Sequence, residues 1–74
     1  MKQLRWETEN RFYCARVYKD MLDFWVVEKA WGGRQNNLGN IGQEVVPTYR
    51  DAIQTVLRIH KERRARKYDL VESR

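Results

Sequence analysis

The chain contains one cysteine and one histidine, Cys14 and His60, from which no Ser-His-Asp or Cys-His catalytic arrangement can be argued. Cys14 lies in an aromatic-rich stretch that predicts a strand, where a small buried hydrophobe is expected. His60 lies within an apolar stripe at helical spacing, which predicts a packed, hydrogen-bonded histidine rather than a general base. The two residues fall short of the four ligands of a structural zinc site. The sequence therefore predicts no enzyme activity, no catalytic residue, no metal site and no cofactor.

The net charge of +5 is concentrated in one segment, residues 58–67. Its six basic residues face a single acid, Glu62, and elsewhere the basic and acidic residues cancel. The six are Arg58, Lys61, Arg63, Arg64, Arg66 and Lys67. Complementing a helix dipole uses only the last turn, so a segment this basic predicts a polyanionic partner.

A second candidate contact is the run Trp31-Gly32-Gly33-Arg34, which opens a glycine-rich stretch over 32–44. The indole of Trp31 can stack on a base or sugar, and Arg34 can bind phosphate. Gly32 allows the backbone to approach a ligand closely. The stretch is predicted to be a loop, which is long for a mere connection. Trp31 at the edge of the core, closing the sheet, is an equally consistent interpretation.

These residues need elements to position them. Residues 1–31 are predicted to form strands, interrupted by polar breaks at 8–10 and 20–23, with the runs 12–18 and 24–31 richest in strand-favouring types. Further strands are predicted over 43–46 and 68–72. Thr48 as N-cap with Asp51 at the third helical position predicts a helix that runs to about Arg66.

The predicted helix carries its apolar residues on one side. They are Tyr49, Ala52, Ile53, Val56, Leu57 and Ile59. One helix of this length covers one face of a four- or five-stranded sheet. We therefore expect one α+β domain over residues 1–74, since the chain is too short for a second core. The nine aromatic residues must supply its packing, because a lone cysteine forms no intrachain disulfide.

The first residues contain no apolar run typical of a signal peptide, and no stretch has the roughly eighteen apolar residues of a membrane span. With the free thiol, this predicts a reducing, cytoplasmic setting without membrane contact.

The glycine-rich motif with its flanks resembles the WGR domain, which is named for a Trp-Gly-Arg triplet. The similar segments are Phe12-Tyr13, Asp20-Met21-Leu22 with Trp25, Trp31 to Arg34 with Gly39 and Gly42-Gln43, Tyr49 to Ala52, and Arg63 to Tyr68. They cover nearly the whole chain, in the order found in the small stand-alone bacterial type. Three departures stand out: Gly33 splits the triplet, Asp23 replaces a turn glycine, and Lys67 replaces a helix-ending glycine.

The resemblance implies a twisted antiparallel sheet with one long helix packed on one face. In DNA-damage-responsive poly(ADP-ribose) polymerases the WGR domain binds DNA near a strand break, with its tryptophan near the terminal nucleotide, and its arginine relays contacts between domains. By position, Trp31 takes the stacking role and Arg34 the phosphate or partner contact. The chain is too short to hold the polymerase's catalytic domain.

The sequence thus favours a non-enzymatic nucleic-acid-binding module, with DNA ends or breaks as the favoured partner and low sequence specificity. The predicted contacts are Trp31, Gly32, Arg34, Arg63, Arg64, Arg66 and Lys67. A protein–protein adaptor that docks an acidic partner on the same loop is the main alternative. An RNA-recognition-motif-like binder built on Arg11–Tyr18 and a membrane-surface role are weaker, and no small-molecule substrate is expected. The hypothesis requires the stretch after Trp31 and the basic helix end to share one surface.

Overall fold

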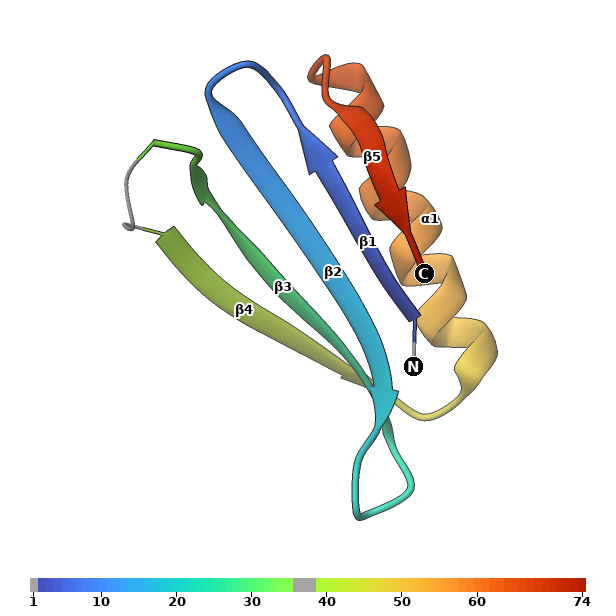
Figure 1. The fold of residues 1–74 in the computed structure, drawn as a ribbon. Coiled ribbons are helices and arrows are strands. Elements are labelled where there is room, and N and C mark those ends of the chain that lie inside the picture. The colour runs from blue at the N-terminus through green and yellow to red at the C-terminus, as the bar shows by residue number, and fades with distance from the viewer. Residues whose placement is uncertain (1, 36–38) are drawn as a thin grey trace.

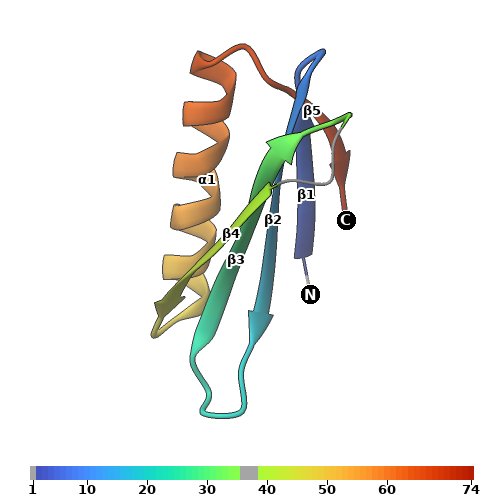
Figure 2. The same ribbon diagram turned by 90° about the vertical axis from the view of Figure 1, so that its left-hand side faces the viewer.

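A computed structural model describes residues 2–35 and 39–74, which form five strands and one helix. In chain order the elements are β1 (Lys2–Glu7), β2 (Arg11–Lys19), β3 (Trp25–Gly33), β4 (Gly39–Val46), α1 (Tyr49–Ala65) and β5 (Asp69–Ser73). The strands form one antiparallel sheet in the order β4-β3-β2-β1-β5, and α1 packs on one face of it (Figure 1, Figure 2). The predicted α+β fold, with one helix on a four- or five-stranded antiparallel sheet, is confirmed.

The β2–β3 turn forms where it was predicted, over residues 20–23, and projects beyond the other strands (Figure 1). The carboxylate oxygen Oδ1 of Asp20 accepts hydrogen bonds from the backbone N–H groups of Leu22 and Phe24, both at 2.9 Å. Asp23 has a φ of 66°, a left-handed conformation that aspartate tolerates better than most residues. An aspartate at each end of the turn therefore fixes the hairpin.

Alternate side chains of the strands point towards α1 and form the core. The buried cluster consists of Leu4, Trp6, Ala15, Val17, Val27, Ala52, Val56, Ile59 and Tyr68. Trp6 is fully buried, and its indole Nε1–H donates a hydrogen bond to His60 Nδ1 at 3.0 Å. This bond joins β1 to α1 and satisfies a polar group that burial would otherwise penalise. The predicted role of His60 as a packed, hydrogen-bonded histidine is confirmed.

Cys14 departs from its predicted role as a buried hydrophobe. In the β1–β2 register it lies opposite Arg5, on the sheet face that points away from α1. Its side chain is half-buried, and its Sγ accepts a hydrogen bond from Arg5 Nη1 at 3.4 Å. The two outward-facing side chains therefore cover one another on a face that no helix protects.

The N-terminus of α1 is capped as predicted. Thr48 Oγ1 accepts a hydrogen bond from the N–H of Asp51 at 3.1 Å, and the same hydroxyl donates to the Asp51 carboxylate at 2.9 Å. The predicted apolar face is too wide, because Leu57 is 56% exposed and Tyr49 is 47% exposed. The sheet covers a narrower arc of the helix than those side chains span. This helix is not long and apolar enough to cross a membrane, and it is the only helix in the described part of the chain.

The C-terminus of α1 closes with two backbone hydrogen bonds. The N–H of Tyr68 donates to the carbonyl of Arg63 at 2.9 Å, and the N–H of Lys67 donates to the carbonyl of Arg64 at 3.0 Å. This is the pattern of a Schellman motif, which requires a left-handed residue after the helix. Lys67 has that conformation, with a φ of 68°, at a position where glycine is favoured.

The loop predicted over 32–44 is shorter than expected. β3 continues to Gly33 and β4 begins at Gly39, and of the residues between them 36–38 lie outside the described residues. No described glycine has a positive φ. Gly39 serves close approach instead, since a Cβ at this position would lie 2.9 Å from the carbonyl oxygen of Trp31. These glycines therefore allow two strands to pair closely where composition alone predicted a loop.

We expect His60→Leu to lower the free energy of unfolding by about 1–3 kcal/mol, because the buried N–H of Trp6 loses its acceptor. His60→Gln, which retains an acceptor oxygen, should lose less. Urea unfolding followed by circular dichroism measures both. Equal stability of His60→Leu and the parent protein would contradict a structural role for this bond.

Candidate nucleic-acid interface

An open groove of about 920 Å³ is lined by residues from the C-terminal end of α1 and from the ends of β2, β3 and β4. We call it the Trp31–Arg63 groove. Its lining is Thr8, Asn10, Arg11, Tyr13, Trp31, Gly32, Gly33, Asn40, Arg63, Arg66 and Tyr68. The groove brings the stretch after Trp31 and the basic end of the helix onto one surface, as the binding hypothesis requires.

Trp31 forms part of the groove wall and is half-buried. The β2–β3 register places Tyr13 opposite it, and the two rings stack with centroids 5.7 Å apart and planes inclined by 14°. The far edge of the indole lies over Gly42, 3.5 Å from where a Cβ would stand. Trp31 thus packs at the end of the sheet and also lines the groove, while stacking of its indole on a base or sugar stays a prediction.

Arg63 lies between two tyrosines in the groove. Its guanidinium carbon is 4.4 Å from the ring centroid of Tyr13 and 5.0 Å from that of Tyr68. Such contacts hold a cation over aromatic faces without neutralising it. Within the described part of the chain Arg63 forms no ion pair, and its Nε–H is buried without a hydrogen-bond partner. The guanidinium is therefore oriented and still has donors available.

The charged residues that line the groove are all positive. Three arginines line it, Arg11, Arg63 and Arg66, and among the described lining residues there is no aspartate or glutamate. Burial raises the pKa of the Tyr13 hydroxyl above its ordinary value, even though the charge of Arg63 lowers it. Tyr13 therefore stays neutral around pH 7 and adds no negative charge. The groove is suited to an anionic ligand.

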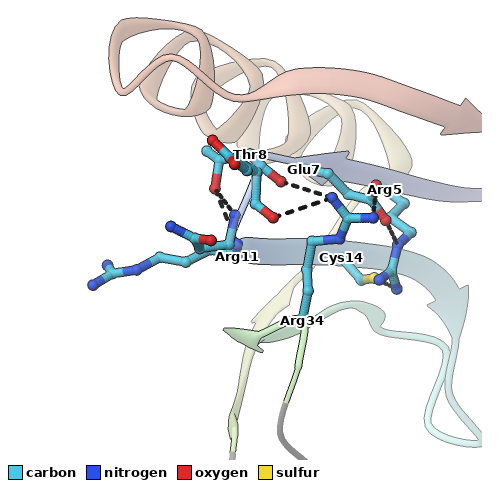
Figure 3. Close-up of polar contacts among 8 residues, drawn as sticks. Arg5, Glu7, Thr8, Arg11, Cys14 and Arg34 are labelled. Atoms are coloured by element: carbon cyan, nitrogen blue, oxygen red, sulfur yellow. Dashed lines mark hydrogen bonds and ion pairs between the residues drawn. The ribbon is translucent and has the colours of Figure 1, made fainter.

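Arg34 does not line the Trp31–Arg63 groove (Figure 3). Its Nη1 donates to the backbone carbonyls of Thr8 and Glu9 at 3.1 and 3.3 Å, and its Nη2 lies 3.6 Å from Glu7 Oε1. The hydrogen bond from Arg5 Nε, at 2.7 Å, lowers the pKa of Glu7 and keeps this carboxylate ionised for the pair. Arg34 thus fastens the end of β3 to the β1–β2 turn.

The extra glycine explains this placement. Side chains alternate along a strand, so a residue two positions after Trp31 shares its face and a residue three positions after it faces the opposite side. Gly33 lies two positions after Trp31, and Arg34 therefore lies three positions after it, facing the opposite side. The predicted pairing of Trp31 with Arg34 in one contact surface is therefore not seen.

The other predicted basic contacts do not all lie in the groove. Arg63 and Arg66 line the groove, whereas Arg64 Nη1 lies 3.7 Å from Asp69 Oδ1. Lys67 lines a separate shallow hollow of about 310 Å³ beside Arg34. That hollow also contains the carboxylates of Glu7, Glu9 and Asp69, so its charge is mixed. Of the predicted contacts, the groove unites Trp31, Gly32, Arg63 and Arg66.

Seven groove residues are not among the predicted contacts: Thr8, Asn10, Arg11, Tyr13, Gly33, Asn40 and Tyr68. The register of the β2–β3 hairpin would have identified two of these residues. The β2–β3 turn was correctly located, and pairing outward from it brings Tyr13 opposite Trp31 and Arg11 opposite Gly33. Tyr68 reaches the groove only because the chain reverses at the end of α1, which no short motif reveals.

No protein-family model, curated protein or solved structure matches the chain. Among the described residues, no group of three or more His, Cys, Asp or Glu side chains could hold a metal ion. The functional interpretation therefore depends on the groove itself.

We expect Lys67→Gly to raise the free energy of unfolding by about 1 kcal/mol, because glycine adopts a left-handed conformation without a Cβ penalty. Lys67→Ala is the matched control, since it removes the same charge and keeps the Cβ. Thermal unfolding of both variants separates strain from charge. A stabilised alanine variant would show that charge, not backbone conformation, sets the effect.

Proposed function

We propose that this protein is a non-enzymatic nucleic-acid-binding module whose contact surface is the Trp31–Arg63 groove. The observation that carries the proposal is the set of three arginines, free of acidic neighbours in the described lining, beside a tryptophan–tyrosine stack. DNA ends or breaks are the favoured target, in keeping with the resemblance to the WGR domain. No step of this function requires catalysis, a metal or a cofactor.

Phosphate recognition is assigned first to Arg63. Its guanidinium is planar and offers paired N–H donors that match two phosphate oxygens. The two flanking tyrosine rings restrict its orientation, so less conformational freedom is lost on binding. Arg66 and Arg11 line the same groove and extend the positive surface along a phosphate chain.

Base or sugar contact is assigned to Trp31. Its indole is held by the stack on Tyr13 and remains half-buried in the groove wall. Stacking on an aromatic ring tolerates every base, and phosphate contacts carry no sequence information. A surface built from these two kinds of contact binds with low sequence specificity.

Arg34 receives a different role from the one first predicted. It holds the β1–β2 turn, whose Thr8 and Asn10 line the groove, and so acts as a positioning residue. Arg11, which pairs with Gly33 in the sheet and lines the groove, takes the contact role in its place. The proposed contact set is therefore Trp31, Gly32, Arg11, Arg63 and Arg66.

We expect Arg63→Gln to weaken binding to a nicked duplex at least about tenfold, because one oriented phosphate contact is lost. The slope of log affinity against log salt should become shallower by roughly one unit from a parent value near −3. Arg50→Gln is the matched control, since it removes an exposed arginine in the first turn of the same helix. Gel shifts at several salt concentrations measure both quantities.

For Trp31→Ala, the loss in binding free energy to duplexes with ends or nicks should exceed the loss in the free energy of unfolding. Comparing blunt, nicked and single-stranded oligonucleotides identifies the preferred form. If the parent protein gives no salt-sensitive shift with any of them at micromolar concentration, nucleic-acid binding is contradicted and the acidic-protein adaptor becomes the better interpretation.

A further inference from the structure

The outer edge of the sheet at β4 has little of the usual protection against pairing. Natural edge strands are shortened, bulged or marked by lysine and proline. β4 extends over eight residues and contains neither lysine nor proline, and its single charged residue is Glu44. Figure 1 shows no element beyond it. Its backbone groups along this edge are available to another strand.

The opposite edge, at β5, is shorter, irregular in register and more charged. β5 has five residues, and its register against β1 shifts between Arg5 and Trp6. It also carries Asp69 and Glu72. The contrast singles out β4 as the pairing edge.

The side chains of β4 have a symmetric pattern. On the sheet face away from α1, Ile41 is 81% exposed and Val45 is 53% exposed. They lie two residues before and two residues after Gln43. In an antiparallel pair centred on Gln43, each exposed Ile41 would meet the Val45 of the other strand. The strand is therefore complementary to a second copy of itself.

We propose that β4 pairs antiparallel with β4 of a second copy of this chain, about a twofold axis at Gln43. The two five-stranded sheets then form one continuous sheet with both helices on the same face. Ile41 and Val45 of the two chains form an apolar cluster on the other face. An isologous contact of this kind closes at two copies.

Charge complementarity on the helix side supports the same register. Lys29 Nζ lies 3.3 Å from Glu44 Oε2, and its Cε lies 3.9 Å from where a Cβ of Gly42 would stand. The proposed pairing places the second copy's Glu44 opposite Gly42, which has no side chain to separate it from Lys29. Arg58 Nη2, at 2.7 Å, also pairs with Glu44. Each carboxylate therefore meets cations rather than its own counterpart.

This inference goes beyond the proposed function and does not depend on it, because Ile41, Gln43 and Val45 do not line the Trp31–Arg63 groove. Sedimentation equilibrium without nucleic acid tests it over a concentration series that reaches the millimolar range. We expect the mass to rise from 9.0 kDa to twice that value. A mass that stays at 9.0 kDa throughout overturns the proposal.

Substitutions locate the interface. Val45→Lys should weaken dimerisation at least about tenfold by placing a charge in the apolar cluster. Val71→Lys, at a residue of 52% exposure on the β5 edge, is the matched control and should leave the dimer unchanged. Ile41→Lys is the second variant, and circular dichroism checks that each variant folds. A dimer that survives both Val45→Lys and Ile41→Lys lies elsewhere and overturns the proposal.

Cross-linking tests the register. In a Cys14→Ala background, Gln43→Cys should form a disulfide-linked dimer, because residues that face each other in an antiparallel pair lie within disulfide distance. Val71→Cys should not. Equal cross-linking of the two variants overturns the β4 interface.

Discussion

The hydrogen bond between Trp6 and His60 fixes the relation of the helix to the sheet. The chain has 74 residues and one cysteine, so the core cannot rely on a disulfide and must depend on large buried side chains. Trp6 is the largest of these, and its N–H has one acceptor, His60 Nδ1. Arg63 lies one helical turn beyond His60 and on the same side. The contact that sets the helix in the core thus also sets Arg63 over Tyr13.

Acidic side chains are distributed so that they neutralise the basic residues outside the groove. Glu44 binds Arg58 and Lys29, Asp69 lies beside Arg64, and Glu7 lies beside Arg34. Partial burial raises the pKa of Glu44, but hydrogen bonds and charges from Lys29 and Arg58 outweigh this effect. The net result is a lowered pKa, so this carboxylate remains ionised. Three basic residues that form no ion pair within the described part of the chain, Arg11, Arg63 and Arg66, line the Trp31–Arg63 groove. The placement of the acids therefore shapes the positive surface as much as the placement of the arginines.

The elements could be predicted from the sequence because their signals are local. The turn at 20–23 and the cap at Thr48 follow from residue type and position. The extent of β4 could not be predicted, since glycine lowers strand propensity and its value here lies in close contact with Trp31. The two-sided environment of Arg63 joins Tyr68, which is close in sequence, to Tyr13, which is distant in sequence. Arg34 was predicted beside Trp31, but it lies just beyond the end of β3, where its side chain bonds to the β1–β2 turn.

The three tryptophans occupy three different environments, and this gives the protein an internal optical reporter. Trp6 is sealed in the core and hydrogen-bonded, Trp25 packs edge-on against Tyr49 near the start of the helix, and Trp31 stands in the groove wall. A ligand in the groove would change the emission of one indole while the other two provide a constant background. Occupancy of the groove can thus be followed on the unlabelled chain, separately from the integrity of the core.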